Sequence, residues 1–476
     1  MKNFINRLLI VFLFFLISAA SLINAAEFDK TLYANRRAKL INEIQDGVLI
    51  LFGNDQVYRN SDITYRFRQN SDFYYLTGFE DADAVMVLTP GEQKEYNLFL
   101  HKKHFFEILF AGEGNNVNTA MEVFGADTAY YLDDFESFVN KISHSKKKLY
   151  YNFSDEDFNK RITKKEAHSF AWHPNEIVNP ESIIGQLRVY KDDTEIKLVG
   201  KANEISCEAI AEVMRAAKPG MNERELEGIL NYVWKKFGSP RYAYPPIISS
   251  GERIPILHYD ANDADIEDGD LVMMDVACEY GYYSADVTRT FPVNGKFTKE
   301  QKEIYEIALA SLNAGIEMMK PGVKLDDVND RTIEVIAEGL YDLGLITDKS
   351  KVWQTSVFYS FYCGHFIGLD THDVGHSQVY EPGMIFAIEP GIYVNPVNFE
   401  KLPSMIKYLR GATEEEVFAF MTAVRPMVQK YANVCGRAED NILITKKGNI
   451  NLTKTLTKTV EGIETLMAEE TKYIKD

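Results

Sequence analysis

Cysteines, prolines and apolar runs long enough to span a membrane are scarce in this chain. Its 476 residues include 4 cysteines and no CxxC pair, which excludes a disulfide-built scaffold and argues against structural zinc. With 29 glycines and 15 prolines, the chain lacks the composition of collagen or of a disordered protein. The remaining composition, 46% apolar and 26% charged, is that of a globular protein. The length predicts about two or three domains.

Basic residues are also in short supply. The chain has 52 lysines and arginines against 70 aspartates and glutamates, a net charge of −18. Such an acidic chain repels polyanions, which argues against nucleic acid or an anionic membrane as its main partner. Small or cationic ligands remain possible.

The N-terminus has the layout of a secretory signal peptide. Lys2 and Arg7 precede an apolar run over residues 8–20, and Ser21 and Ala25-Ala26 supply small residues after it. The run has 13 residues, fewer than the roughly 20 that a bilayer core requires. We expect a signal peptide over residues 1–26 and a periplasmic or extracellular protein, with an uncleaved anchor as the alternative.

Two domains are expected after this segment. Residues 27–185 alternate short apolar runs with turn signals, a pattern typical of an α/β domain. After a proline-broken stretch, residues 192–194 can cap a helix whose apolar positions recur at three and four. A second domain is therefore predicted over residues 186–476. Within it, Thr413 and Glu416 predict a capped helix whose apolar stripe packs in the core.

Two aspartates in apolar surroundings give the first indication of a metal site. Residues 271–278 and 284–292 read as strands, and a hairpin turn at Tyr280-Gly281 would place Asp275 opposite Asp286. Two carboxylates facing each other in a buried hairpin need a positive charge between them, and a divalent cation is the natural candidate. The alternative is a pair of solvated aspartates on the surface of a sheet.

Three further candidates lie downstream: His365, Glu389 and Glu439. Taken alone, each can be structural. Together with the two aspartates they make four carboxylates and one imidazole, a donor set that suits two divalent ions. A set rich in carboxylates and free of thiolates favours manganese or another hard or borderline ion. Of the cysteines, three lie within four residues of a candidate ligand, and both a disulfide and free thiols remain open: Cys278, Cys363 and Cys435.

The motifs around these residues resemble those of the pita-bread metallopeptidase family. The order Asp, ten residues, Asp, then His, Glu and Glu is typical of the whole family. Its proline-specific branch, aminopeptidase P, is indicated by ILHY at residues 256–259, HFIGLDTHDVG at 365–375 and EPGIY at 389–393. Residues 59–79 also resemble the N-terminal domain of aminopeptidase P. The resemblance implies an α+β fold, a pita-bread (creatinase-like) catalytic domain preceded by a smaller α/β domain.

The resemblance also implies a role for each candidate ligand. Asp275 would hold one metal, Asp286 and Glu439 would bridge two, and the ligand shells would be completed by His365 and Glu389. The two ions would most commonly be Mn²⁺, with Co²⁺ or Zn²⁺ as alternatives. A water bridging them would be deprotonated near neutral pH.

Three more residues are implicated in handling substrate. His258 and His372 match histidines that orient substrate and stabilise charge, and Glu389 would pass on the proton of the water. Arg437 matches an arginine that shapes the pocket on the proline side. Because side chains two apart share a face of a strand, Arg437 and Glu439 are expected on one strand.

The function implied is hydrolysis of the bond between an N-terminal residue and a following proline. The expected partners are peptides beginning Xaa-Pro, and the chain would form a homo-oligomer, a dimer or a tetramer. One alternative is a prolidase, which cleaves only dipeptides and could use Arg437 for the substrate carboxylate. The other is a creatinase-like or non-catalytic relative without metal.

The chain departs from the pattern of this branch in three places. Phe361 stands where relatives usually carry a further histidine. Residues 107–114 lack the tryptophan and paired arginines often found there. Glu389 and Glu439 are separated by 49 residues, more than in compact relatives.

Overall fold

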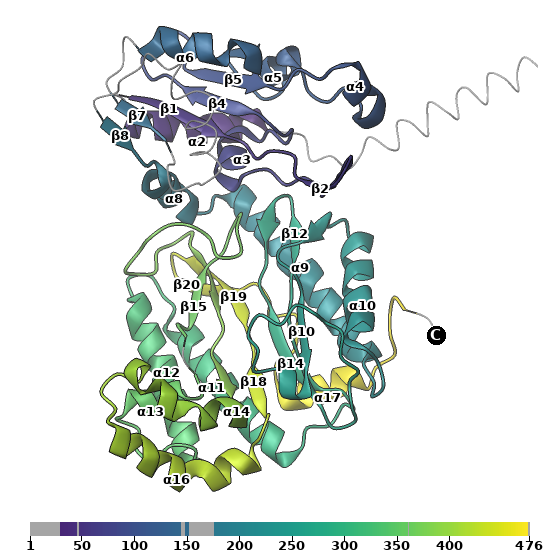
Figure 1. Cartoon of the computed structure of the whole chain (residues 1–476), viewed down its shortest axis with the longest axis vertical. Helices are drawn as coiled ribbons and strands as arrows, with labels where there is room; N and C mark the ends of the chain where they lie inside the picture. Colours follow the sequence, from purple (N-terminus) through teal and green to yellow (C-terminus); the bar gives the residue numbers. More distant parts are fainter. Residues whose placement is uncertain (1–28, 45–46, 144–147, 152–175, 360, 475–476) are drawn as a thin grey trace, which may run out of the picture. The chain divides into compact units, whose positions relative to one another are not determined.

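The computed structural model describes residues 29–44, 47–143, 148–151, 176–359, 361–474. Contacts between Cα atoms divide the chain into Met1–Ile184 and Gly185–Asp476 (Figure 1). The expected signal peptide, residues 1–26, lies outside the described residues. Among the helices of the described part, none is long and apolar enough to cross a bilayer.

The first unit is built on one mixed six-stranded sheet in the order β6-β5-β4-β1-β7-β8. Its strands are β1 (Gly47–Phe52), β4 (Val85–Leu88), β5 (Tyr96–Leu100), β6 (Thr128–Tyr131), β7 (Lys148–Tyr150) and β8 (Glu176–Val178). The central pair, β1 and β4, is antiparallel, whereas β1 and β7 run parallel. The apolar runs that form β1, β4 and β5 are buried in the core, whereas β6 is half-buried and β8 is mostly exposed.

The other elements of this unit are short except for its first helix. They are α2 (Lys30–Glu43), α3 (Ser71–Thr77), α4 (Phe105–Ala111), α5 (Val117–Glu122), η1 (Leu132–Asp134), α6 (Phe135–Ser143) and a small hairpin of β2 (Tyr58–Asn60) and β3 (Ile63–Thr64). Helix α4 buries none of its side chains, although its sequence is FFEILFA.

The second unit places strands between two pairs of long helices, with α9 (Asp193–Ala216) and α10 (Glu223–Lys236) on one side and α11 (Lys299–Met318) and α12 (Leu325–Asp342) on the other (Figure 1). Helix α9 begins as the sequence predicts: the Asp192 carboxylate accepts from the backbone N–H groups of Thr194 and Glu195. Helix α8 (Glu181–Val189) spans the boundary between the units, and the second unit also contains η3 (Gly251–Arg253), α13 (Val352–Ser356) and α17 (Val460–Met467).

The strands of this unit form four small sheets in the described part of the chain. Their orders are β10-β11-β14, β13-β12-β9, β15-β16-β19-β20 and β17-β18. The strands are β9 (Arg241–Tyr242), β10 (Ile247–Ser250), β11 (Leu271–Asp275), β12 (Cys278–Tyr280), β13 (Tyr283–Ser284), β14 (Thr288–Pro292), β15 (Gly364–Phe366), β16 (Ile385–Ile388), β17 (Gly391–Tyr393), β18 (Cys435–Arg437), β19 (Asp440–Thr445) and β20 (Gly448–Asn451).

The hairpin predicted around Asp275 and Asp286 exists, but its predicted register is wrong. The turn is Gly281-Tyr282, with φ angles of +56° and +71°, and Asp275 pairs with Thr288. Two positive φ angles suit a tight hairpin turn of the type that matches strand twist. Moving the turn by one residue shifts the partner of each residue by two positions along the opposite strand. Residues two apart share a face of a strand, so Asp286 lies on the same face as Thr288, the actual partner of Asp275.

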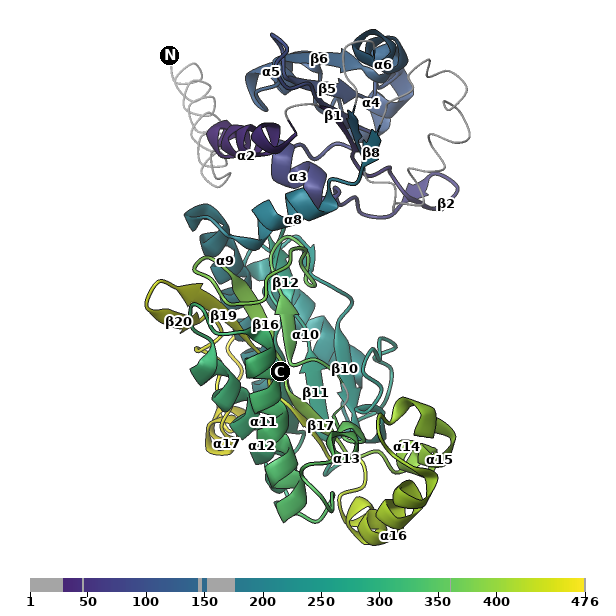
Figure 2. The ribbon, with the colours of Figure 1, turned by 90° about the vertical axis from the view of Figure 1, so that its left-hand side faces the viewer.

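The long segment between Glu389 and Glu439 folds into a helical lobe. Helices α14 (Pro396–Glu400), α15 (Leu402–Met405), η4 (Ile406–Tyr408) and α16 (Glu414–Lys430) lie together (Figure 2). Helix α16 starts with the predicted capping box of Thr413 and Glu416. Its apolar stripe is buried, which confirms that it packs in the core: Val417, Phe420, Met421, Val424 and Val428.

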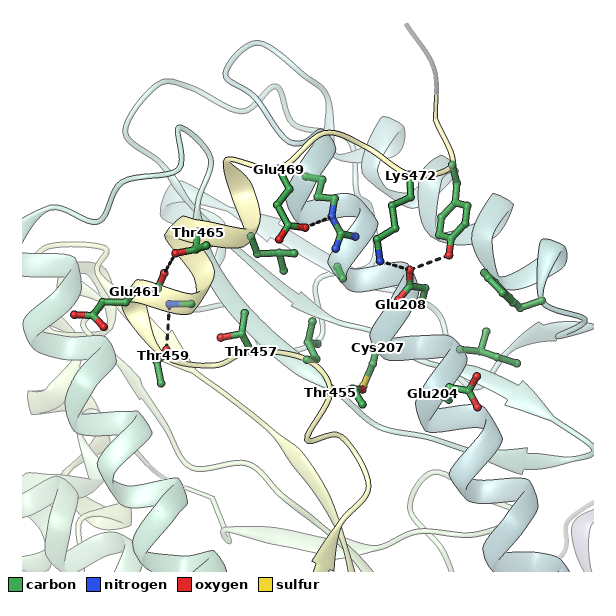
Figure 3. A pocket seen from close by; sticks show the side chains of 18 residues that line it. Glu204, Cys207, Glu208, Thr455, Thr457, Thr459, Glu461, Thr465, Glu469 and Lys472 are labelled. Carbon is green, nitrogen blue, oxygen red and sulfur yellow. Dashed lines mark hydrogen bonds and ion pairs between the residues drawn. The ribbon is translucent and has the colours of Figure 1, made fainter.

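The last described residues are fastened to α9 by buried and partly buried carboxylates. Glu212, fully buried, accepts from the backbone N–H groups of Lys472, Tyr473 and Ile474 at 2.9, 2.6 and 3.1 Å. Glu208 accepts from the Lys472 ammonium at 3.1 Å (Figure 3). Arg215 and Glu469 form a further ion pair at 2.9 Å. The C-terminal segment is thus part of the second unit's fold.

Candidate metal centre

A cavity of about 820 Å³ in the second unit collects every site residue that the sequence predicts. Its lining includes the five candidate ligands and the three substrate residues: Asp275, Asp286, His365, Glu389, Glu439, His258, His372 and Arg437. Residues up to 181 positions apart in the sequence therefore meet in one place.

Strand pairing explains how these distant residues meet. Asp275 ends β11, Glu389 follows β16, and Glu439 precedes β19. Strand β16 pairs with β15, placing Gly364 opposite Ile388, and with β19, placing Ile388 opposite Asp440. Strand β15, the residue after β16 and the residue before β19 thus bring His365, Glu389 and Glu439 together. Gly364 permits this approach, because a Cβ there would lie 1.9 Å from the Ala387 carbonyl oxygen.

The ligand atoms form overlapping clusters. One comprises Asp275, Asp286 and Glu439, and another comprises His365, Glu389 and Glu439; within each, the atoms lie within 4.8 Å of one another. Because Glu439 belongs to both clusters, it is placed to bridge two ions. Asp286 also belongs to two clusters, since it forms a third with His365 and His372.

Two buried atoms without hydrogen-bond partners indicate whether this donor set fits a metal. Neither Nε2 of His365 nor Oε1 of Glu439 has a hydrogen-bond partner among the described residues. The other ring nitrogen of His365, Nδ1, lies 3.0 Å from the carbonyl oxygen of Phe366, so its N–H donates there. That contact leaves the Nε2 lone pair for a cation, an arrangement typical of metal-binding histidines. The residues therefore fit divalent metal.

The protonation equilibria of the cluster reflect its crowded charges. Burial raises the pKa of Asp275, that of Glu439 well above its usual range, and that of Glu389 to about 7. Burial also opposes the charged form of His365, but contact with the Asp286 carboxylate raises its pKa to about 9. Burial also acts on Asp286, but the His365 ring, with Nε2 3.4 Å from Oδ2 of Asp286, leaves the pKa of this carboxyl lowered. Raised carboxyl pKa values of this kind are expected where buried carboxylates are crowded together, and cations bound there would lower them.

Arg437 contacts two of the carboxylates directly. Its Nη1 donates to Oε2 of Glu389 at 3.2 Å, and its Nη2 donates to Asp275. The side chain is almost fully buried, so it lies behind the ligands as a fixed positive charge. The structure therefore gives Arg437 a part in orienting ligands; its predicted place on the proline side stays a prediction.

The expectation that Arg437 and Glu439 share one strand is wrong. Strand β18 ends at Arg437 and β19 begins at Asp440. Here the chain changes partner, because β18 pairs with β17 whereas β19 pairs with β16. At the change, the Glu439 N–H donates to the Thr288 carbonyl oxygen at 3.0 Å.

Two hydroxyl groups around the ligands were missed by the sequence reasoning. The Tyr244 hydroxyl lies 2.6 Å from Asp275 Oδ1 and 2.5 Å from Asp286 Oδ1. The Thr288 hydroxyl donates to Glu439 Oε2 at 2.7 Å. Thr288 could have been found, because it lies two residues after Asp286 and so on the same face of the strand. No pattern around Tyr244 signals its contact.

The two predicted substrate histidines occupy loops beside the ligands. The ring of His372 lies 4.2 Å from that of His365, measured between centroids. Partial burial, together with the nearby His365, lowers the pKa of His372, which favours a neutral ring. His258 lines the same cavity. Phe361 also lines it, with its ring 4.9 Å from that of Tyr359, so the departure from the usual histidine makes this wall more apolar.

The cysteines form no bridge near the site. All four, Cys207, Cys278, Cys363 and Cys435, are buried and free. Of the two possibilities left open by the sequence, the structure has free thiols.

Comparison with known proteins agrees with this geometry. The model of metallopeptidase family M24 matches residues 197–446, and that of the aminopeptidase P N-terminal domain matches residues 33–150. The chain is 31% identical to Xaa-Pro aminopeptidase of Escherichia coli over 466 residues, covering 94% of this chain and 100% of the relative. It is 31% identical to Xaa-Pro aminopeptidase of Haemophilus influenzae, covering 93% and 98% of the two chains.

A solved structure shows the same fold. Aminopeptidase PepP of Pseudomonas aeruginosa superposes with a TM-score of 0.82 at 33% identity, covering 93% of this chain and 99% of that one. The α+β fold and the resemblance to aminopeptidase P expected from the motifs are thereby confirmed. Since one family model matches more than half of its length, the chain belongs to metallopeptidase family M24.

Proposed function

We propose that the chain is a metal-dependent aminopeptidase that releases the N-terminal residue from peptides with proline in the second position. The observation that carries the proposal is the convergence of all five expected ligands in one cavity. The relatives from Escherichia coli and Haemophilus influenzae are named Xaa-Pro aminopeptidases, and they support this substrate class.

The donor set favours two divalent ions, with manganese as the first choice and cobalt or zinc as alternatives. Four carboxylates, one imidazole and no thiolate make a hard site. When bound, the ions supply Lewis-acid polarisation of the scissile carbonyl and a water activated for attack near neutral pH. Asp275, Asp286, His365, Glu389 and Glu439 hold them.

The other steps of the reaction fall to side chains that line the cavity. Glu389 lies in the cavity among the other candidate ligands, where its carboxylate can pass on the proton of the attacking water. His258 and His372 can donate a hydrogen bond to the carbonyl oxygen as negative charge develops there. Arg437 and Tyr244 keep the carboxylates in place through the contacts described above.

Two alternative functions are less well supported. A prolidase would need a cation for the carboxylate of a dipeptide, but both Nη atoms of Arg437 already contact Glu389 and Asp275. A creatinase-like or non-catalytic relative would not need a complete ligand set, which this cavity retains.

Two further features of the biology are part of the proposal. Residues 1–26 would direct export to the periplasm or the extracellular space, and the chain would self-associate as a dimer or tetramer. Self-association is supported by α4, where four large apolar side chains are 62–84% exposed: Phe105, Phe106, Leu109 and Phe110. Clustered apolar exposure of this kind marks an interface more often than an ordinary surface.

The first prediction concerns the substrate. Manganese-loaded protein should cleave Xaa-Pro-Xaa tripeptides and leave Xaa-Pro dipeptides largely intact. Glu389→Ala should lose at least about 10³-fold in kcat/KM, because a ligand and a proton acceptor disappear together. Glu204→Ala, on the exposed surface of α9, is the matched control and should keep full activity. Faster turnover of the dipeptide would favour the prolidase, and an active Glu389→Ala would refute the site.

The second prediction concerns pH. Loading the metal-free protein with Mn²⁺ should release more protons at about pH 6 than at about pH 8.5. With a pKa of about 7, the Glu389 carboxyl is mostly protonated at the lower pH and must lose its proton to coordinate, whereas at the higher pH it is already ionised. Calorimetry in buffers of different ionisation enthalpy measures the release. A release that does not vary with pH would contradict the assignment.

The third prediction concerns self-association. Phe110→Glu, which places a charge at the most exposed position of α4, should lower the mass of the particle in sedimentation or light-scattering measurements. Tyr408→Glu is the control, because Tyr408 is 67% exposed in the helical lobe of the second unit. If the mass is unchanged by Phe110→Glu, α4 is not the interface.

The fourth prediction concerns export. Mass spectrometry of protein recovered from the periplasm or medium should find an N-terminus near Glu27, as expected for cleavage after a short apolar segment. An intact N-terminus in the membrane fraction would indicate the uncleaved anchor instead. Intact chain confined to the cytosol would contradict export.

A further inference from the structure

A cluster of four charged side chains, three of them buried, lies beside the metal cavity and includes none of the candidate ligands. Nη2 of Arg188 lies 2.7 Å from Asp370 Oδ2 and 2.5 Å from Asp373 Oδ1. Nζ of Lys191 lies 2.8 Å from Asp373 Oδ2. The side chains of Arg188, Lys191 and Asp373 are 3%, 1% and 1% exposed, so Asp373 is a buried carboxylate between two buried cations.

The cluster clamps the loop that carries His372. Asp370 and Asp373 are both held by Arg188, and the two residues between them, Thr371 and His372, line the metal cavity. The Asp373 N–H donates to the Phe366 carbonyl oxygen at 2.9 Å, which ties the loop to the strand of His365. The backbone on either side of His372 is therefore fixed by ionic contacts to residues near position 190.

The packing around Asp373 leaves the loop no room to shift. At Gly368, an added Cβ would lie 2.2 Å from Asp373 Oδ2 and 2.9 Å from the Lys191 side chain. Gly185, in α8, approaches the backbone of Gly375 so closely that a Cβ there would lie 3.1 Å from its nitrogen. Glycine at both places lets the loop press against the cluster.

A cluster of this kind is a poor way to add stability. Removing charges from water costs several kcal/mol per ion, which the ion pairs repay only with good geometry. Lys191 and Arg188 overcome the effect of burial and keep the pKa of Asp373 below its usual value, so the carboxylate remains charged. Buried charges can instead restrict a segment to one conformation, and here the restricted segment is the loop that carries His372.

We propose that Asp373, gripped by Arg188 and Lys191, is a positioning residue that holds His372 where it meets the scissile carbonyl. The inference rests on the proposed function, since His372 is the group that would contact the developing charge. Asp373 touches no substrate and acts only through its neighbour. A merely structural role would instead lower stability without depending on His372.

A double-mutant cycle on manganese-loaded protein separates these roles. His372→Ala should lower kcat/KM by about 10²- to 10³-fold, the usual loss for one donor to a developing oxyanion. Asp373→Asn should lower kcat by about 10- to 100-fold with little change in KM or metal content. In the His372→Ala background, Asp373→Asn should cost no more than about twofold, because its route of action is already gone. Additive losses, or loss of metal, would overturn the proposal.

Glu212→Gln is the matched control. It makes the same carboxylate-to-amide change at a fully buried position, where Glu212 serves the C-terminal segment. It should lower the melting temperature but leave kcat unchanged. If Asp373→Asn does not fold, Lys191→Met can replace it in the same double-mutant cycle. Arg188 still holds Asp373 in that variant, so the loss of kcat from the single substitution should be smaller. Additivity there would equally refute the inference.

A readout without catalysis distinguishes this inference from the proposed function. In histidine-labelled, metal-free protein, Asp373→Asn should shift or broaden the NMR signal of the His372 ring, assigned by its absence in His372→Ala, while that of His258 stays in place. If the wild-type protein cleaves no Xaa-Pro peptide, the proposed function fails, but this measurement still tests the positioning. An unchanged His372 signal overturns the positioning itself.

Discussion

The crowding of four carboxylates in one buried cavity is the constraint on which the rest of the second unit depends. Asp275, Asp286 and Glu439 are buried, and Glu389 is nearly so. Carboxylates drawn together out of water repel one another, and the raised pKa values of Asp275, Glu389 and Glu439 express that cost. A fold keeps such an arrangement only where positive charge offsets it, and two divalent ions do so within one unit of charge when a hydroxide is counted.

Residues around the cavity hold the candidate ligands through hydrogen bonds and ion pairs of their own. Arg289, fully buried, donates from Nη1 to the carbonyl oxygens of Thr288 and Glu439 at 2.8 and 2.7 Å, and pairs through Nη2 with Asp440. The backbone of Glu439 is thus held at both its N–H and its carbonyl group. The hydroxyl groups of Tyr244 and Thr288 and the guanidinium group of Arg437 contact the carboxylate oxygens of the candidate ligands directly. Ligands held in this way would lose less conformational freedom when a metal binds.

The sequence predicts the identity of the site better than its local geometry. Residue type and the expected hairpin point to Asp275 and Asp286, and hard cations prefer such oxygen donors. The motifs that resemble a known family single out His365, Glu389 and Glu439, and the structure brings all five into one cavity. The hairpin register was displaced by two positions, since nothing in Tyr280-Gly281-Tyr282 shows which pair adopts positive φ. The predicted face of Asp286 is nevertheless correct, because a shift of two residues leaves a side chain on the same face of a strand. The contacts of Arg188 and Lys191 with Asp373, 185 and 182 residues away, could not be predicted, because local pattern carries no information at that separation.

The candidate metal ligands and His372 are therefore held in different ways. His365, Glu389 and Glu439 lie in or directly beside β15, β16 and β19, whose ladder hydrogen bonds set their spacing. His372 lies on a loop, which a ladder cannot hold and which in most proteins moves more than the elements it joins. A hydrogen bond to a developing charge loses its value if the donor wanders by about 1 Å. At His365 a strand fixes the position of the side chain. At the loop of His372 the buried ion pairs of Asp373 do the same, although burying charges costs free energy.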